Sequence, residues 1–195
     1  MAPTPFMMDS RLNPSQRETL LGLARAAIRY GLEHATIMPI TTRHYDDALR
    51  EQGASFVTLT LAGELRGCIG SLEAHRPLAE DVVHNAFSAA FSDPRFMPLS
   101  SAELERIKIA ISVLNPAEAL NVSSEAQLIA QLRPGIDGLI LQEGSRRGTF
   151  LPSVWEQLPD PEQFLHHLKL KAGLPAHHWS ETLRFYRYTT TQFSE

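Results

Sequence analysis

Alternating apolar side chains mark two neighbouring β-strands in this sequence. Residues 56–61 are rich in β-branched and aromatic side chains, and a short turn containing Gly63 separates them from a second apolar run at residues 65–70. Two such runs joined by a glycine-containing turn predict a β-hairpin. The same alternation predicts further strands at residues 107–114, 138–142, 149–151 and 183–188.

Helical spacing of apolar residues predicts helices between these strands. The first begins at a capping box formed by Asn13 and Gln16, and Gly31 is suitably placed to end it in a left-handed conformation. A second capping-box pattern, at Ser100 and Glu103, predicts a brief helix. Other helices are predicted at residues 43–52, 77–91, 124–132 and 160–171.

The order of these elements favours one fold class. Helices and strands are interspersed irregularly, and tight hairpins rather than crossover connections join two of the strand pairs. We therefore expect an α+β fold with a mainly antiparallel sheet flanked by helices. The length of 195 residues suits a single domain. We place that domain at residues 13–195, after a flexible leader at residues 1–12 that contains Pro3 and Pro5.

Composition and charge narrow the classes of function. The net charge of −4 and the pI of about 6.1 disfavour a generic nucleic-acid binder, because such proteins neutralise phosphates with a basic surface. One cysteine cannot form an intrachain disulfide, and the sequence begins without the pattern of a secretory signal. No apolar run approaches the roughly 20 residues that span a bilayer. We expect a cytoplasmic protein without a membrane segment.

The run at residues 65–70 holds the chain's one cysteine, Cys68. A period of two predicts that Arg66 and Cys68 share one face of the strand, and that Leu65, Gly67 and Ile69 share the other. Glycine weakens a strand, so the glycines of this run indicate a bulge, a bend or a close approach of another group. A close approach would suit a ligand.

Six short segments, taken in order, resemble the motifs of a known family. They are Phe56-Val57-Thr58-Leu59, Leu65-Arg66-Gly67-Cys68-Ile69-Gly70, Asp93-Pro94-Arg95-Phe96, Ser112-Val113-Leu114, Leu151-Pro152 and Lys171-Ala172-Gly173. From Asn13 onward the chain is similar to the AMMECR-one domain family, also called AmmeMemoRadiSam system protein A.

This resemblance implies a fold and a region, but no reaction. It implies a mainly antiparallel α+β fold with a smaller appended lobe, and a suspected functional cleft near the cysteine motif. Many prokaryotic members are encoded with a Memo-type dioxygenase-like protein and a radical SAM protein, which become possible partners. The chain has Asp137 where many members have a histidine, so a mechanism that needs this histidine is not expected here.

Cys68 has a catalytic interpretation and a structural one. A thiolate is the strongest nucleophile among side chains, and a cation such as Arg66 would favour its ionisation. A single cysteine in an apolar strand can equally be a small buried hydrophobe. His75 and His84 are the histidines nearest in sequence, but neither has the signature of a catalytic base.

The arginines of the motifs suggest an anion site. The planar fork of Arg66 suits a carboxylate or phosphate, with Arg95 and Lys171 as second and third cations. Alternatively, Arg66 pairs with a buried acid such as Asp93, and Asp93 itself fixes the turn that contains it. The predicted ligand-binding residues are Arg66, Gly67, Gly70, Asp93, Arg95 and Lys171, beside Cys68 as the candidate nucleophile.

No metal site or cofactor is predicted from the sequence. The pairs His166-His167 and His177-His178 lack the spacing of a known metal site, so solvated surface histidines are the simpler interpretation. One cysteine cannot supply the three thiolates of a radical SAM cluster. There is also no glycine-rich phosphate-binding loop.

Two hypotheses of function follow. The leading one is an enzyme or small-molecule-binding protein that uses a cleft around Arg66 and Cys68, in a pathway with Memo-type and radical SAM proteins. The alternative is a noncatalytic interaction module whose motif surface docks one of these proteins. The sequence leaves the oligomeric state, the substrate and any cofactor open.

Overall fold

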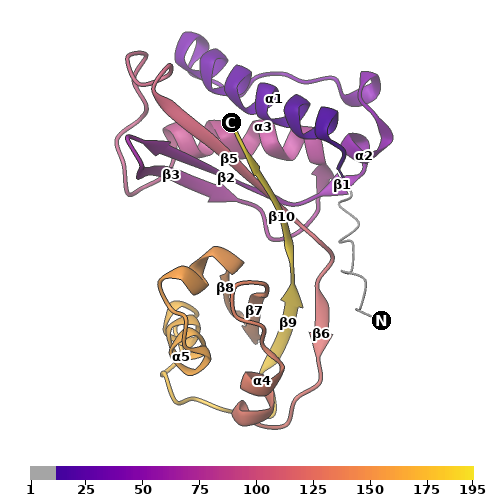
Figure 1. Cartoon of the computed structure of the whole chain (residues 1–195), viewed down its shortest axis with the longest axis vertical. Coiled ribbons are helices and arrows are strands. Elements are labelled where there is room, and N and C mark those ends of the chain that lie inside the picture. Colours follow the sequence, from indigo (N-terminus) through magenta and orange to yellow (C-terminus); the bar gives the residue numbers. More distant parts are fainter. Residues whose placement is uncertain (1–11) are drawn as a thin grey trace, which may run out of the picture. The chain divides into compact units, whose positions relative to one another are not determined.

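The computed structural model describes residues 12–195, which form two compact units (Figure 1). The first unit contains residues 12–113 together with 191–195, and the second contains residues 114–190. The predicted leader lies outside the described residues except for Leu12, which is buried in the core of the first unit. Among residues 12–195, no helix combines the length and the apolar character that crossing a membrane requires.

A four-stranded sheet forms the base of the first unit. Its strands are β2 (Ser55–Leu61), β3 (Glu64–Gly70), β5 (Ile107–Leu114) and β10 (Thr190–Ser194), in the order β10-β5-β2-β3. β2 pairs antiparallel with both β3 and β5, which confirms the predicted hairpin. β3 is therefore an edge strand of this sheet, as Figure 1 shows.

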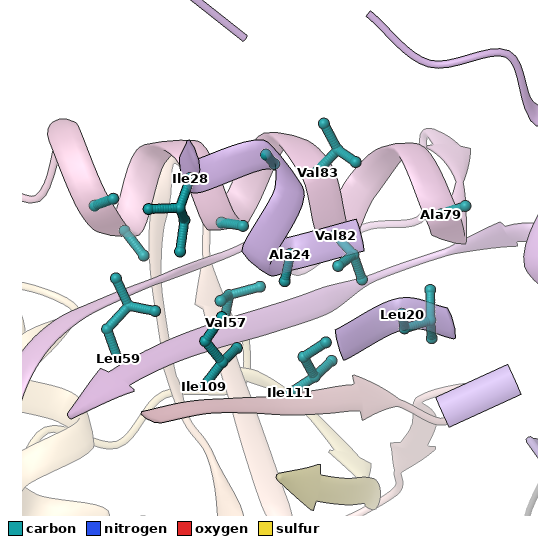
Figure 2. Close-up of a cluster of buried hydrophobic side chains, with 14 of the residues drawn as sticks. Leu20, Ala24, Ile28, Val57, Leu59, Ala79, Val82, Val83, Ile109 and Ile111 are labelled. Carbon is teal, nitrogen blue, oxygen red and sulfur yellow. The ribbon is translucent and has the colours of Figure 1, made fainter. Parts of the chain in front are cut away.

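Two helices, α1 (Pro14–His34) and α3 (Leu78–Phe91), build the core on this sheet. They pack against each other, and α3 also packs against β2 and β3. The predicted capping box of α1 is present, since Asn13 and Gln16 bond to each other's backbone N–H. Figure 2 shows side chains of this buried core: Leu20, Ala24, Ile28, Val57, Leu59, Ala79, Val82, Val83, Ile109 and Ile111.

Gly31 does not end α1, contrary to the prediction. The helix continues to His34, and Ala35 takes the left-handed conformation with φ 53°. Gly31 is instead a packing position, because a Cβ there would lie 2.4 Å from the ring of Phe91. Tertiary contact with α3 therefore explains this glycine.

The connection from α1 to the sheet is less helical than predicted. In place of the single helix predicted at residues 43–52, the chain forms η1 (Thr42–His44), α2 (Asp47–Arg50) and β1 (Gln52–Gly53), which pairs with β4 (Arg76–Pro77). The brief helix predicted after Ser100 is also absent, since this segment forms turns.

The hairpin contains an irregularity that changes the predicted faces of β3. Leu59 pairs with Gly67, but the next residue, Thr60, pairs with Leu65, so Arg66 is the extra residue of a β-bulge. Leu65 is 43% exposed whereas Gly67 is buried. The prediction that Leu65 and Gly67 share a face is therefore wrong, because strict alternation does not continue across a bulge.

Residues at the end of the described chain complete the first unit. β10 lies beside β5 in the sheet, although no strand was predicted there. The Glu195 carboxylate accepts hydrogen bonds from Arg25 Nε at 2.7 Å and from the backbone N–H of Ile109 at 3.1 Å. Arg25 also donates to the carbonyl of Leu104, so one guanidinium joins α1 to two distant segments.

The second unit repeats the combination of sheet and helices on a smaller scale. Its sheet has the order β6-β9-β7-β8, and every pairing is antiparallel. The strands are β6 (Glu118–Leu120), β7 (Gly138–Glu143), β8 (Arg146–Phe150) and β9 (Arg184–Tyr188), and the helices are α4 (Glu125–Gln131), η2 (Pro152–Glu156) and α5 (Pro161–Lys171). The α+β class with a smaller lobe is thus confirmed.

Two details of this unit differ from the prediction. The β7–β8 turn is limited to residues 144–145, because β8 already begins at Arg146 rather than at Thr149. β6 was not predicted, since a three-residue edge strand carries too little alternation to be recognised.

Candidate functional site

Close packing within the first unit accounts for the glycines of the cysteine motif. A Cβ on Gly67 would lie 2.1 Å from the carbonyl oxygen of Ala89 in α3, so only glycine lets this helix approach β3. A Cβ on Gly70 would lie 2.2 Å from the ring of Phe56. The close approach inferred from these glycines is therefore made by the protein itself, and their role in ligand binding stays a prediction.

The turn after α3 brings Asp93 and Arg95 against the edge of β3. The Asp93 carboxylate accepts a hydrogen bond from the backbone N–H of Cys68 at 2.9 Å, and Arg95 Nη2 donates to the Cys68 carbonyl at 3.3 Å. Arg95 also binds Asp93 through Nε at 2.9 Å and Nη2 at 2.7 Å. One ion pair thus satisfies both backbone groups of Cys68.

Charge-assisted hydrogen bonding fixes Asp93 in its ionised form. The side-chain hydrogen bond from Arg95 is the largest cause that holds the pKa of the Asp93 carboxyl well below its ordinary value, although burial opposes it. The pKa of Arg95 is raised by the same bond. Asp93 is only 4% exposed, so this ion pair is a fixed part of the turn.

Arg66 pairs with Glu103, not with Asp93 as the sequence suggested. Its Nε lies 2.7 Å from Glu103 Oε1, and its Nη2 donates to Glu103 Oε2 at 3.2 Å and to the carbonyl of Met97 at 3.0 Å. The hydrogen bond from Arg66 is the main cause that lowers the pKa of Glu103 to about 2. Arg66 Nη1 is buried and has no hydrogen-bond partner among residues 12–195.

The capping-box pattern correctly predicted that Ser100 and Glu103 are in contact. The prediction that they begin a helix was wrong. The N–H and hydroxyl of Ser100 both donate to Glu103 Oε2 at 2.8 Å, as in a capping box. The chain continues as turns, which leave the same carboxylate free to bind Arg66. Glu103 is therefore a site residue that sequence reasoning missed, because its partner lies 37 positions away.

Phe96 lies against both guanidinium groups. Its ring centroid is 5.9 Å from the guanidinium carbon of Arg66 and 5.4 Å from that of Arg95, within the range of cation–π contact. Next to it, Met97 is 80% exposed, and Leu65 precedes Arg66 with 43% exposure. These five residues, Leu65, Arg66, Arg95, Phe96 and Met97, are called the motif surface below.

Cys68 is half-buried beside this surface. Its Sγ lies 3.3 Å from the hydroxyl of Thr58 on β2. Within the described part of the chain, the thiol makes no hydrogen bond to a histidine, carboxylate or lysine that could accept its proton. The nucleophile hypothesis remains a prediction, without a base in its support.

Lys171 belongs to the second unit. Its Nζ donates to the carbonyl of Thr149 at 3.0 Å and lies 5.1 Å from the ring centroid of Phe150. The structure therefore brings Arg66, Cys68, Asp93 and Arg95 together in the first unit. Lys171 makes its described contacts in the other unit.

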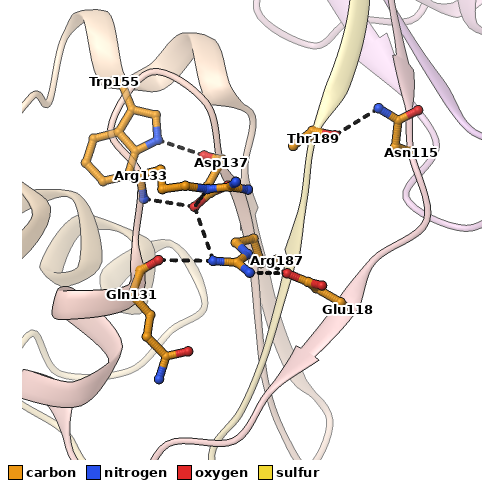
Figure 3. A network of polar contacts seen from close by, with 8 residues as sticks. All are labelled: Asn115, Glu118, Gln131, Arg133, Asp137, Trp155, Arg187 and Thr189. Carbon is orange, nitrogen blue, oxygen red and sulfur yellow. Dashed lines mark hydrogen bonds and ion pairs between the residues drawn. The ribbon is translucent and has the colours of Figure 1, made fainter. Parts of the chain in front are cut away.

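Asp137 anchors a polar network in the second unit (Figure 3). Its buried carboxylate accepts hydrogen bonds from Arg133 Nη2 at 2.6 Å and from the Arg133 backbone N–H at 2.8 Å, and Arg187 Nη1 lies 3.9 Å away. The Trp155 indole donates to the Asp137 carbonyl at 2.7 Å. At the position where the resemblance implies a histidine in many members, this chain holds a structural carboxylate.

His166 is buried rather than solvated, which corrects the prediction for this residue. It is 9% exposed, and its Nε2 lies 3.1 Å from Glu125 Oε1. Glu125 Oε2 also accepts from Lys169, whose side chain is fully buried. Over residues 12–195, no cluster of three or more histidine, cysteine or acidic side chains could hold a metal ion.

Comparison with known proteins agrees with the resemblance seen in the sequence. Residues 21–193 match the AMMECR1 family. A Methanothermobacter thermautotrophicus protein is 38% identical over 97% of this chain and 99% of its own length, and Protein MK0488 of Methanopyrus kandleri is 38% identical over 96% and 92%. The crystal structure of the uncharacterised protein PH0010 from Pyrococcus horikoshii has a TM-score of 0.87 and 32% identity, covering 95% of this chain and 94% of that one. The chain therefore belongs to the AMMECR1 family.

Proposed function

We propose that this protein is an interaction module that docks a partner protein on the motif surface. The observation that carries the proposal is the exposure of Met97, which follows the arginine-flanked Phe96, and of Leu65, which precedes Arg66. Methionine, aromatic residues and arginine are enriched at protein interfaces, and aromatic and arginine side chains often dominate binding energy. Ion pairs with Glu103 and Asp93 hold the two arginines in fixed positions before a partner arrives.

The electrostatics of the site favour docking over anion capture or nucleophilic catalysis. Glu103 neutralises Arg66, and Asp93 neutralises Arg95, so neither cation has a full charge to offer to a small anion. A catalytic thiol needs a base or a neighbouring unpaired cation to become a thiolate. Neither is in hydrogen-bond contact with the Cys68 thiol in the described structure.

The chemistry of the surface defines the partner. Met97 and Leu65 would bury apolar side chains of the partner, and the exposed edge of Arg95 would donate a hydrogen bond to an oxygen of the partner. The Memo-type and radical SAM proteins implied by the family resemblance are the proteins to test for such a segment. The proposal assigns this docking to the cytoplasm.

Met97→Asp is expected to weaken binding of the partner about tenfold or more, because it places a charge at the centre of the apolar contact. Leu170→Asp is the matched control, since Leu170 is another exposed large apolar residue, at 54%, and lies on α5. Titration calorimetry with purified Memo-type and radical SAM proteins measures both variants. Binding that is equally strong for wild type and Met97→Asp, or absent for both partners, would contradict the proposal.

A small anionic ligand beside Cys68 is the second candidate, and one observation favours it. The Arg95 side chain is 53% exposed, and its Nη1 has no hydrogen-bond partner within residues 12–195. Asp93 fixes the guanidinium, so this free edge is already oriented for a carboxylate or phosphate.

Alkylation of Cys68 by iodoacetamide tests this second candidate. If the site binds anions, inorganic phosphate or a dicarboxylate should slow the reaction at least severalfold in wild type. The same anions should have no effect in Arg95→Gln. Labelling of Cys68 only after unfolding, or protection that persists in Arg95→Gln, would exclude the candidate.

A further inference from the structure

The outer edge of β3 is closed by side chains rather than by another strand. β3 ends the sheet order β10-β5-β2-β3, so one side of this strand has no neighbouring strand among residues 12–195. On that side Asp93 accepts the N–H of Cys68 at 2.9 Å and Arg95 donates to its carbonyl at 3.3 Å. An unprotected edge would present these groups as a template for a further strand.

The ion pair reproduces the bonding of an antiparallel strand partner. In an antiparallel ladder, two opposite residues of a hydrogen-bonded pair exchange both N–H···O bonds. The Asp93 carboxylate takes the place of the partner's carbonyl, and the Arg95 guanidinium takes the place of the partner's N–H. Because Arg95 also binds Asp93 at 2.7 Å, acceptor and donor are held at the spacing that one residue of a strand would provide.

The second unit shows a related arrangement. β8 is the edge strand of the order β6-β9-β7-β8, and Lys171 donates to its Thr149 carbonyl at 3.0 Å. A Cβ on Gly148 would lie 3.0 Å from that of Ala172, so a glycine again lets a helix approach the edge strand. In both units a cation at or just after the end of a helix thus donates to a carbonyl of the edge strand.

We propose that Asp93 and Arg95 form a plug that prevents β3 from pairing with β3 of a second copy of this chain. A second copy of the chain is the partner that would pair with this edge, because the outward N–H and carbonyl of Cys68 are complementary to the same two groups of another copy. A two-fold axis through Cys68 would pair its N–H and carbonyl with the same groups of the other copy, as in other isologous contacts. Such a pairing sets Gly67 opposite Ile69 and Arg66 opposite Gly70, without like charges facing each other.

The double substitution Asp93→Ala with Arg95→Ala removes the plug and is expected to cause self-association. Sedimentation velocity should show a dimer with a dissociation constant at least tenfold lower than that of wild type. Asp47→Ala with Arg50→Ala is the control, because it removes another ion pair of the same charges, an exposed one in α2. This control should sediment like wild type.

Adding Cys68→Pro to the double variant tests whether the dimer uses this edge. Proline lacks the N–H that the second copy would bind, and it is tolerated on edge strands where that N–H points outward. The triple variant should return to the sedimentation of wild type. A dimer that persists in it, or a folded double variant that sediments like wild type, would overturn the proposal.

Two further measurements distinguish dimerisation through the β3 edge from unfolding and from association through the motif surface. Circular dichroism checks the fold, and if the double variant is unfolded, Arg95→Gln takes its place with the same criteria. Met97→Asp in the double variant should leave the dimer unchanged, because Met97 contributes only its carbonyl, which binds Arg66, to the described hydrogen bonds. A dimer abolished by Met97→Asp would assign the association to the motif surface and overturn the edge pairing.

Discussion

Gly67→Ala is expected to lower the free energy of unfolding of the first unit by about 3 kcal/mol, at the upper end of the usual cost of overpacking. The added methyl group would meet the backbone oxygen of Ala89 at 2.1 Å. A backbone oxygen in the last turn of α3 cannot rotate away like a flexible side chain. Either the helix moves off the sheet or β3 bends, and both disturb the core. Urea denaturation, followed by hydrogen exchange of β3 and α3 amides, measures the loss.

Gly22→Ala is the matched control for this prediction. Gly22 lies inside α1, and apart from its chain neighbours and the backbone of its own helix, no atom of residues 12–195 lies within 4 Å of the position of an added Cβ. The same substitution should therefore stabilise the unit by about 0.5–1 kcal/mol, because alanine has a higher helix propensity than glycine. A Gly67→Ala protein as stable as wild type would show that α3 and β3 do not approach as closely as described.

Glu125→Gln is expected to destabilise the second unit by about 3 kcal/mol. Lys169 is fully buried, and Glu125 is the carboxylate that its ammonium contacts. Removing the negative charge leaves a buried cation without compensation, beside the ring of Trp179 and near His166. Thermal and urea unfolding of the variant measure the change.

Lys169→Met should cost much less, about 1 kcal/mol or below, because replacing a buried charge by an apolar side chain of similar length also removes its desolvation cost. Glu118→Gln is the control, since Glu118 pairs with Arg187 but is 60% exposed, and exposed pairs contribute about 1 kcal/mol or less. Equal losses for Glu125→Gln and Glu118→Gln would mean that Lys169 is hydrated in solution.

Local patterns were sufficient to predict most elements of the fold. The β2–β3 hairpin, the capping box at Asn13 and the helices at residues 78–91 and 161–171 depend on neighbours within a few positions. Gly31 was misinterpreted because its role depends on Phe91, which lies on another helix. A glycine that ends a helix and a glycine that packs against one look the same in a sequence.

The residues of the candidate site could be grouped from the sequence, but the hydrogen-bond partner of Arg66 could not be predicted. Arg66, Cys68, Asp93 and Arg95 were correctly grouped, yet the bulge at Arg66 and its bond to Glu103 depend on contacts between distant segments. From the sequence, these residues were predicted to bind a ligand or to react. In the structure, their hydrogen bonds close a strand edge and fix a turn. Such bonds become visible only when the strand order is known.

Because residues 191–195 belong to the first unit, the two units differ in when they can finish folding during synthesis. Residues 114–190 form a compact unit of their own, inserted between β5 and β10 of the first. On the ribosome, this inserted unit can be finished while the first unit still lacks β10 and the Glu195 bond to Arg25. Until then the outer edge of β5 is uncovered, so the nascent chain has an open strand edge that the finished protein does not show.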